Sequence, residues 1–450
     1  MFLPRPVTAF VLVFALAGAA LLPPVPAQAV RQRLPGFSRR QAATSSTVEP
    51  RLLAAVDTRY CSKVLGLVDE LVRKHFFEAK LAQSAWPAIL ARHRQAIVAS
   101  SSLKQLSERL NAAIKELKSS HCQFVTINDE TYYFLHTLFH CSCAPVPTRV
   151  TETFFRSHPR CKMDYTGAVT GGVGCNTRQV RYVLDGSPAQ GAGVKVGDEI
   201  LSIDGRPYTG QLSLDGCAGR STRLSIARQG KTFAISLTPE LKDDAGAYVE
   251  AIGKSVAVFD RPEGKIGYVH LWSGGSAAHE AFEEALSGKL QQTDALIVDF
   301  RDGYGGNFFD DLDFFYRPPA GYPSFSTISR LGKRDSSHLC YDKPLVSIIN
   351  SGVRSGRELL AYSLKKTGRA VLVGENTAGA VLAGRLFPVD DRCSLYLAVA
   401  RADVGSTCLE GVGVAPDVEV KLSASERGVH DTQLSEALRI AFERLSGKGQ

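Results

Sequence analysis

The chain has 450 residues, of which 44% are hydrophobic and 22% are charged, as is usual for a folded globular protein. A chain of this length is expected to hold two or three domains. The net charge is +8, but lysine and arginine are spread along the chain without a dense basic block, so the composition argues against nucleic-acid binding.

Residues 1–29 have the features of a secretory signal peptide. One arginine, Arg5, precedes the apolar run TAFVLVFALAGAALL, and the small residues of "AQA" end at Ala29. The apolar run is shorter than the roughly 20 residues that a spanning helix needs, and no later stretch is long and apolar enough to cross a membrane. Because no cysteine lies near Ala29, a lipid-anchored form is not expected. We therefore expect an exported protein, periplasmic or extracellular, without a stable membrane span in the mature chain.

Export would place the cysteines in an oxidising compartment, where disulfide bonds are expected. Their even number is compatible with full pairing, but spacing does not give the connectivity. The ten are Cys61, Cys122, Cys141, Cys143, Cys161, Cys175, Cys217, Cys340, Cys393 and Cys408. A metal site is the alternative for the stretch HTLFHCSC, which contains His136, His140, Cys141 and Cys143. Its spacing matches no zinc motif, so we expect no metal there.

The first part of the mature chain is expected to be helical. Residues 30–50 are rich in Pro, Gly and Ser and are typical of a linker. From residue 51 to 118, the runs CSKVLGLVDELVRKHFF and LKQLSERLNAAIKEL repeat apolar residues at helical spacing. We therefore predict an N-terminal helical domain over 51–160, whose helices end near KSSHCQFV.

A β-rich module is expected over 163–241. Short β-rich runs such as RQVRYVL, DEILSIDG and TRLSIARQGKTFAISL are separated by turn residues. Between them, GSPAQGAGVKVGDEILSIDGRP (186–207) resembles a PDZ domain of the bacterial protease type. The resemblance implies a short helix after GSPA, a tight turn at Gly197-Asp198, a strand from Ile200, and binding of extended peptides at a sheet edge. A β-rich module without a ligand is the alternative.

The remaining third alternates strand and helix patterns, which predicts an α/β layered domain over 250–425. KIGYVHLW precedes the helical AHEAFEEALSGKL, and the apolar β-branched run PLVSIIN (344–350) precedes a helical run with Leu359, Leu360 and Leu364 on one face. Ser355 therefore stands where a buried strand turns into a helix. At the end of the chain, a C-terminal helix is expected over 426–450.

Three motifs occur in an order that resembles the C-terminal processing (tail-specific) peptidases and the related tricorn-type peptidases. They are DFRDGYGGN (299–307), GVRSGRELLAYSLKKTGRAVLVGENTAG (352–379) and EGVGVAPDVEV (410–420). The resemblance covers most of residues 60–440. It implies a multi-domain α+β chain with an N-terminal helical domain, a PDZ-like domain and an α/β (ClpP/crotonase-like) serine peptidase domain.

In the family that the chain resembles, the nucleophilic serine lies three residues before a Glu that starts a helix. Here that Glu is Glu358, so the resemblance implies Ser355 as the nucleophile. Ser351 does not have this spacing. A helix N-terminus offers backbone N–H groups and positive potential to a developing oxyanion. Glycines let a second backbone approach closely. We expect the oxyanion hole to use the N–H of Gly356 and that of Gly305 or Gly306. The alternative is that these glycines only form a turn.

The base is not expected to be a lysine. Many tail-specific peptidases carry one 25 residues after the serine, where this chain has Ala380. Lys365 and Lys366 are about 15 Å away along the helix, at roughly 1.5 Å per residue, which a lysine side chain cannot span.

The tricorn-type branch instead has a Ser-His pair after the helical segment and a Glu before a G-V-x-P-D stretch. This chain has Ser120-His121 and Glu410 at those places. The resemblance implies His121 as general base and acid, a role that suits a group with an ordinary pKa near 6.5. Ser120 or Glu410 would orient the imidazole, with Ser119 as an alternative to Ser120.

Other residues near these motifs have structural alternatives. We expect Glu375 and Asp302 to hold turns, and Cys122 to be oxidised or buried rather than nucleophilic.

The sequence thus predicts an exported serine endopeptidase that acts on protein or peptide substrates, without metal or organic cofactor. Its PDZ domain would engage substrate tails or gate the site. The alternatives are a catalytically inactive PDZ binding protein on a peptidase-like fold, and an amidase or esterase with the same triad. The oligomeric state is not predicted.

Overall fold

The computed structural model describes residues 55–139, 162–172, 175–176, 178–306, 309–317, 326–328, 330, 334–336, 339–422 and 430–447. The contacts separate Met1–Ser45 from Ser46–Gln450, and every described residue belongs to the second unit. The predicted signal peptide and the whole predicted linker lie outside the described residues, which begin at Ala55. Within them, no helix combines the length and the apolar character that crossing a membrane requires.

The predicted N-terminal helices are present. They are α2 (Thr58–His75), α3 (Ala79–Ser84), α4 (Trp86–Val98) and α5 (Leu103–Lys115). Two of them begin at side-chain caps, because Asp57 accepts from the N–H of Tyr60 and Ser102 from that of Gln105. Their apolar faces are buried in a common core.

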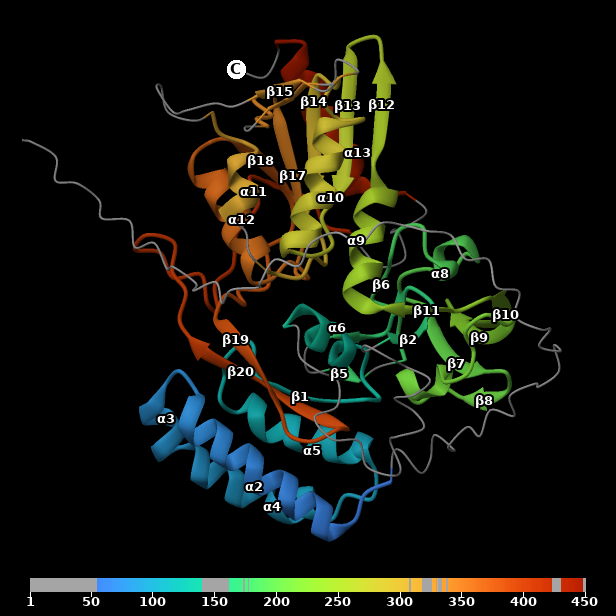
Figure 1. Cartoon of the computed structure of the whole chain (residues 1–450), viewed down its shortest axis with the longest axis vertical. Helices are drawn as coiled ribbons and strands as arrows, with labels where there is room; N and C mark the ends of the chain where they lie inside the picture. The colour runs from blue at the N-terminus through green and yellow to red at the C-terminus, as the bar shows by residue number, and fades with distance from the viewer. Residues whose placement is uncertain are drawn as a thin grey trace, which may run out of the picture. The chain divides into compact units, whose positions relative to one another are not determined.

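A three-stranded sheet packs against these helices and was not predicted from the sequence. Its order is β1-β20-β19, with β1 at Gln123–Thr126, β20 at Cys393–Ala400 and β19 at Ala383–Pro388. Gln123 pairs with Tyr396, so a segment from the α/β part of the chain crosses to the helical part, as Figure 1 shows. The sheet fixes the chain just after Ser120 and His121.

The PDZ-like segment has the expected small elements. They are β2 (Lys162–Tyr165), β3 (Ala168–Val169), β4 (Gly171–Gly172), β5 (Cys175–Asn176), β6 (Tyr182–Val183), α8 (Pro188–Gly191), β7 (Glu199–Ile203), β8 (Arg206–Pro207), η2 (Gln211–Leu214), β9 (Thr222–Arg228), β10 (Lys231–Leu237) and β11 (Glu240–Asp243). The largest sheet has the order β10-β9-β7-β8, and β7, β9 and β10 bury apolar residues in a core of their own. A short helix follows GSPA, a positive φ of 87° at Gly197 makes the turn, and a strand follows, as the resemblance implied.

The α/β part is built on a six-stranded sheet of order β12-β13-β14-β17-β18-β21. Only the β12–β13 pair is antiparallel. The strands are β12 (Ala257–Arg261), β13 (Gly264–His270), β14 (Ala295–Asp299), β17 (Leu345–Ile349), β18 (Ala370–Gly374) and β21 (Val418–Glu419). A separate pair joins β15 (Ser326–Ile328) to β16 (Arg334–Ser336).

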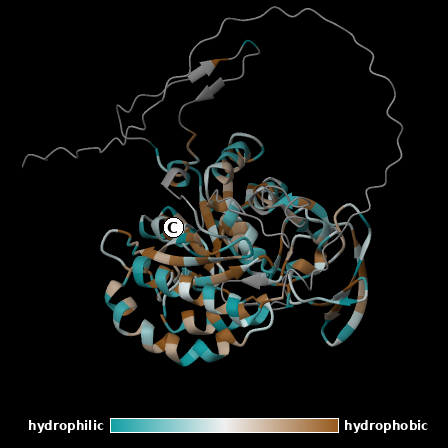
Figure 2. Cartoon of the chain, turned by 60° about the horizontal axis from the view of Figure 1, so that its bottom comes forward, coloured by the Kyte–Doolittle hydropathy of each residue, from teal (hydrophilic) through white to brown (hydrophobic). Residues whose placement is uncertain are grey.

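Helices cover both faces of this sheet. The predicted C-terminal helix, α13 (Thr432–Leu445), packs on one face. In Figure 1 the opposite face carries α9 (Asp244–Ser255), α10 (Ser276–Ser287), α11 (Phe309–Asp313) and α12 (Gly356–Lys366). Figure 2 shows hydrophobic residues concentrated on the strands, while the helices alternate between hydrophobic and hydrophilic faces. The long apolar strand runs are thus buried between two helical layers.

Six of the ten cysteines carry free thiols in the structure: Cys61, Cys122, Cys217, Cys340, Cys393 and Cys408. Pairing of all ten is therefore wrong for this structure. These thiols have other environments; Cys61, for example, donates to the carbonyl of Ser100, and Cys393 lies against Asp390. The side chains of the other four are outside the described residues, so disulfide bonds remain a prediction.

Candidate active site

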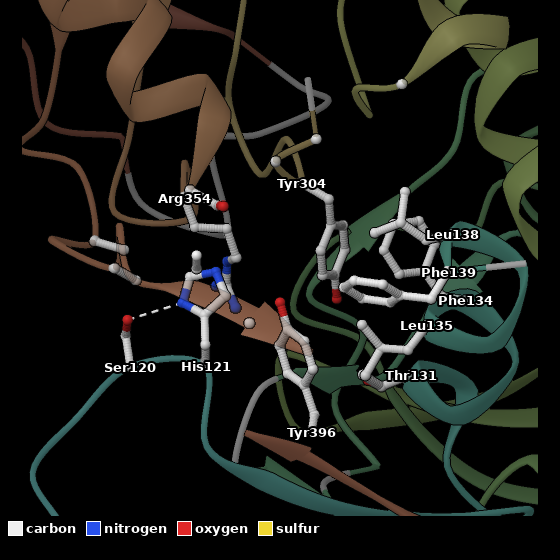
Figure 3. A pocket seen from close by; sticks show the side chains of 18 residues that line it. Ser120, His121, Thr131, Phe134, Leu135, Leu138, Phe139, Tyr304, Arg354 and Tyr396 are labelled. Carbon is white, nitrogen blue, oxygen red and sulfur yellow. Dashed lines mark hydrogen bonds between the residues drawn. The ribbon is translucent and has the colours of Figure 1, made fainter. Parts of the chain in front are cut away.

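A cavity of about 500 Å³ brings together most of the predicted site residues, and Figure 3 shows it from close by. Ser120, His121 and Ser355 all line it, although they come from two distant parts of the chain. Its lining residues are Ser120, His121, Thr131, Phe134, Leu135, Leu138, Phe139, Gly275, Tyr304, Gly305, Gly306, Arg354, Ser355, Ala378, Ala380, Ala383, Gly384 and Tyr396.

Ser355 lies between β17 and α12, at the strand-to-helix turn that the sequence predicted, and its backbone there is strained. Its φ of 56° and ψ of −131° lie where residues with a side chain are rarely found. Its N–H donates to the carbonyl of Ala380 at 2.8 Å. A sharp turn of this kind exposes a serine hydroxyl at the end of a sheet.

Glu358 holds that turn in place from the first turn of α12. Its carboxylate accepts from Thr377 Oγ1 at 2.5 Å and from the N–H groups of Gly379 and Ala380 at 2.7 Å each. Burial raises the pKa of Glu358, and these donors oppose the rise. The residue thereby fixes the segment whose carbonyl binds the Ser355 N–H.

Three glycine N–H groups close to Ser355 donate to no acceptor in the described part of the chain: those of Gly305, Gly306 and Gly356. A Cβ on Gly305 would lie 2.5 Å from Ser355 Oγ and 2.7 Å from Gly356 N. A Cβ on Gly356 would lie 2.1 Å from the carbonyl oxygen of Gly306. Only glycine therefore allows these two backbones to approach so closely, and unpaired donors are left beside the hydroxyl.

Ser120 links His121 to Glu410. Nδ1 of His121 lies 2.8 Å from Ser120 Oγ, which lies 3.0 Å from Glu410 Oε2. Glu410 also accepts from the N–H of Ser120 at 2.9 Å and from that of Val381 at 2.9 Å. Glu410 is thus connected to the imidazole through Ser120, whereas the sequence left open which of the two would orient the ring.

This chain of contacts assigns the tautomer of His121. The carboxylate of Glu410 can only accept, so the Ser120 hydroxyl donates to it. The Ser120 oxygen then accepts from Nδ1–H of His121, which leaves Nε2 without a proton. Nε2 is the nitrogen that can take a proton from a hydroxyl in the cavity.

His121 is held neutral by its surroundings. The residue is 7% exposed, and burial, followed by the positive charge of Arg354, lowers its pKa to about 4. Its φ of 55° marks a second strained turn at the cavity. Among the described residues, no hydrogen bond joins His121 to Ser355 Oγ, although both line the same cavity. Such contacts are often long before substrate binds.

The alternative bases and nucleophiles lie elsewhere. Lys365 pairs with Asp417 at 3.0 Å and Lys366 is exposed, and neither lines the cavity. Ser351 is exposed and does not line it. Cys122 is not suited to act as a nucleophile, because burial raises the pKa of its thiol to about 12.

The predicted turn-holding residues have structural contacts. Asp302, with a φ of 54°, receives a hydrogen bond from Asn350 Nδ2 at 3.3 Å, and Glu375 receives one from Gln433 at 3.4 Å. In the stretch considered for a metal, His136 contacts Ser394 Oγ at 2.8 Å. The other three residues considered as ligands, His140, Cys141 and Cys143, lie outside the described residues.

Sequence reasoning missed most of the cavity wall. Phe134, Leu135 and Leu138 come from α6 (Glu130–Leu138), and Tyr396 comes from β20. No local pattern marks these residues, because the fold alone brings them to Ser355. Arg354 was also missed, although its position directly before Ser355 was a signal that could have found it.

Comparisons with known proteins identify which domains this chain resembles. Residues 265–420 match the description "Peptidase family S41", and residues 179–228 match "PDZ domain". A carboxyl-terminal-processing protease of Synechocystis sp. is 30% identical over 261 residues, which cover 55% of this chain and 60% of that protein. A tricorn protease homologue of Streptomyces coelicolor is 23% identical over 405 residues, which cover 83% of this chain and 32% of that protein.

Among solved structures, a photosystem II D1 C-terminal processing protease aligns with 88% of this chain and 98% of its own, at 19% identity and a TM-score of 0.47. The chain spans only 47% to 64% of the length of four carboxyl-terminal-processing relatives that it matches.

The chain therefore carries a peptidase domain of family S41 preceded by a PDZ domain. The resemblance to C-terminal processing peptidases is confirmed, as is the predicted multi-domain α+β fold class.

Proposed function

We propose that this protein is an exported serine endopeptidase in which Ser355 attacks the peptide bond and His121 transfers the protons. The observation that carries the proposal is the contact chain Glu410–Ser120–His121, which ends in the cavity that Ser355 also lines. An acid, an imidazole in the required tautomer and a serine recur together in hydrolases of unrelated folds. The arrangement favours the tricorn-type set of residues over a serine–lysine pair.

In the first half-reaction, Ser355 Oγ forms a bond to the carbonyl carbon of the peptide while its proton passes to Nε2 of His121. The carbonyl oxygen becomes an oxyanion, to which the N–H of Gly356 and that of Gly305 or Gly306 donate. Glu410, acting through Ser120, stabilises the imidazolium. The C–N bond then breaks, the amine takes the proton from Nε2, and an acyl ester remains on Ser355.

In the second half-reaction, a water molecule gives a proton to Nε2 of His121 and its oxygen attacks the acyl carbon. The ester bond to Ser355 breaks, and Oγ takes the proton back from Nε2. The products are a new carboxyl terminus and the regenerated serine. Every proton is thus moved by His121.

We assign the PDZ domain the task of engaging substrate tails or gating the cavity. PDZ domains bind extended peptides at a sheet edge. Support for coupling comes from Asp185, which accepts from Trp272 Nε1 at 2.9 Å, and from the 2.6 Å contact between the hydroxyls of Tyr182 and Tyr248. Trp272 lies three residues before Gly275, which lines the cavity.

Export is part of the proposal and rests on the signal peptide predicted for residues 1–29. The protein is expected to act in a periplasm or outside the cell. Expression of the full chain followed by N-terminal sequencing of the mature protein tests this, since processing after Ala29 is expected. A chain that keeps its first 29 residues and stays in the cytoplasm would overturn it.

Peptide-bond cleavage is tested with the mature protein and an unfolded protein such as denatured casein. New termini identified by mass spectrometry are expected with the wild type and not with Ser355→Ala. Simple ester and amide substrates are assayed in parallel. Hydrolysis of esters or small amides without any peptide cleavage would show that the protein is an esterase or amidase and not an endopeptidase. If the folded protein cleaves none of these substrates, the alternative of an inactive peptide-binding protein would be supported.

A further inference from the structure

Arg354 places a positive charge in a cavity whose walls are mainly apolar. Phe134, Leu135, Leu138 and Phe139 form one side of the cavity. No Asp or Glu is among the described residues that line it. Figure 3 shows the Arg354 side chain beside His121, on the side of the cavity opposite Phe134 and Leu138.

The guanidinium of Arg354 is only partly used by the protein. Its Nε donates to the carbonyl of Gly352 at 3.1 Å, and its central carbon lies 5.5 Å from the centre of the Tyr304 ring. It pairs with no carboxylate in the described part of the chain. An arginine carries five N–H donors, so the terminal nitrogens keep donors for a ligand.

Two carboxylates beside the site, those of Glu410 and Glu358, are already engaged. Glu410 accepts from Ser120, Val381 and Leu382. Glu358 accepts from the segment that follows β18. Neither forms a hydrogen bond or ion pair with Arg354, so its charge has no direct counterpart in the described chain.

We propose that Arg354 binds a carboxylate of the substrate next to the scissile bond, while the apolar wall holds a neighbouring side chain. The inference rests on the proposed peptidase function and names a substrate preference for it. Arg354 precedes Ser355 directly, and an extended peptide advances about 3.5 Å per residue, so the carboxylate belongs to a residue one or two positions from the bond. A planar guanidinium can bind a carboxylate through two parallel hydrogen bonds.

Two sources can supply this carboxylate: an acidic side chain, or the free C-terminus of the substrate. Two matched peptide pairs separate them. One pair has Glu or Gln beside the cleaved bond, and the other has a free or an amidated C-terminus. The wild type is expected to prefer one carboxylate-bearing member by ~10- to 100-fold in kcat/KM, the range for a hydrogen bond to a charged group.

The matched variants are Arg354→Gln and Arg385→Gln. Arg385 is an exposed arginine on β19 that stacks over Phe387 and does not line the cavity. The preference is expected to fall to about one in Arg354→Gln and to persist in Arg385→Gln. If Arg354→Gln does not fold, Arg354→Lys is used; it keeps the charge but loses the planar fork, so the preference is expected to shrink. An unchanged preference in a folded Arg354 variant would overturn the proposal.

A binding experiment separates this inference from the proposed function. Ser355→Ala is titrated with the same fluorescently labelled peptides, and dissociation constants are measured by anisotropy. Tighter binding of the carboxylate form, lost in the Ser355→Ala Arg354→Gln double variant, supports the anion site even if the wild type cleaves no peptide. Equal binding of acid and amide forms in both pairs overturns the anion site even if the wild type is an active peptidase.

Discussion

The Ser355 turn and the Ser120–His121 segment are held by contacts of very different range. Around Ser355, Glu358 binds the N–H groups of Gly379 and Ala380, which are 21 and 22 residues further along the chain. Ser120, in contrast, binds Glu410, which is 290 residues away in sequence. The proposed nucleophile is therefore built from one strand–helix unit and its immediate continuation, whereas the position of the proposed base depends on contact between two distant parts of the chain.

The difference teaches where the site is most sensitive to domain packing. The Ser355 turn belongs to the six-stranded sheet and its helices. His121 is positioned by β1, which pairs with β20, and by the turn that carries Glu410. A disturbance of the N-terminal helices should therefore misplace the imidazole before it alters the serine turn.

The largest expected effect comes from removing the base. His121→Ala should lower kcat by ~10⁴-fold or more, because loss of one member of such a triad costs about as much as loss of all of them. Cleavage of a peptide substrate is measured together with the circular dichroism spectrum, which should be unchanged. Full activity in the folded variant would mean that another group takes the Ser355 proton.

A smaller effect is expected from Glu358→Gln, which tests how the Ser355 turn is held in place. The amide keeps the shape but brings an NH₂ group to backbone donors. The free energy of unfolding should fall by ~1–3 kcal/mol, as for a buried group left without its partner. Urea unfolding measures it, with Glu375→Gln as control, since within the described residues the Glu375 carboxylate accepts a single long hydrogen bond, from Gln433. Equal stability of both variants would contradict the role given to Glu358.

The smallest expected effect concerns the pH dependence of activity, which is set by His121. His121 must be neutral to accept a proton, and its pKa is about 4. The acidic limb of kcat/KM should therefore lie near pH 4, well below the ordinary value near 6.5. Arg354→Gln should move that limb upward, because one source of the lowered pKa is removed. A limb near 6.5 in the wild type would contradict the burial of the neutral imidazole.

The same shift predicts how stability changes with pH. The pKa of His121 is lower in the folded protein than in an unfolded chain, so the unfolded state binds more protons between about pH 4 and pH 6.5. Its contribution to stability is present above about 6.5 and declines as the pH falls toward 4.

Local patterns predicted the elements that are local in space. The strand before Ser355 and the helix after it follow from residue periodicity, and the resemblance to PDZ domains implied the turn at Gly197. The resemblance to peptidases supplied Ser120, His121 and Glu410, which the fold brings together. The pairing of β1 with β20 could not be predicted, because Gln123 and Tyr396 carry no signal that links them.

The central claim is that Ser355 is an activated nucleophile served by His121. Its most direct test is labelling of the mature protein with a fluorophosphonate probe, followed by mass spectrometry of the modified peptide. The account predicts a label on Ser355 in the wild type, none in Ser355→Ala and very slow labelling in His121→Ala. A folded wild type that stays unlabelled, or a label that forms equally fast without His121, would contradict it.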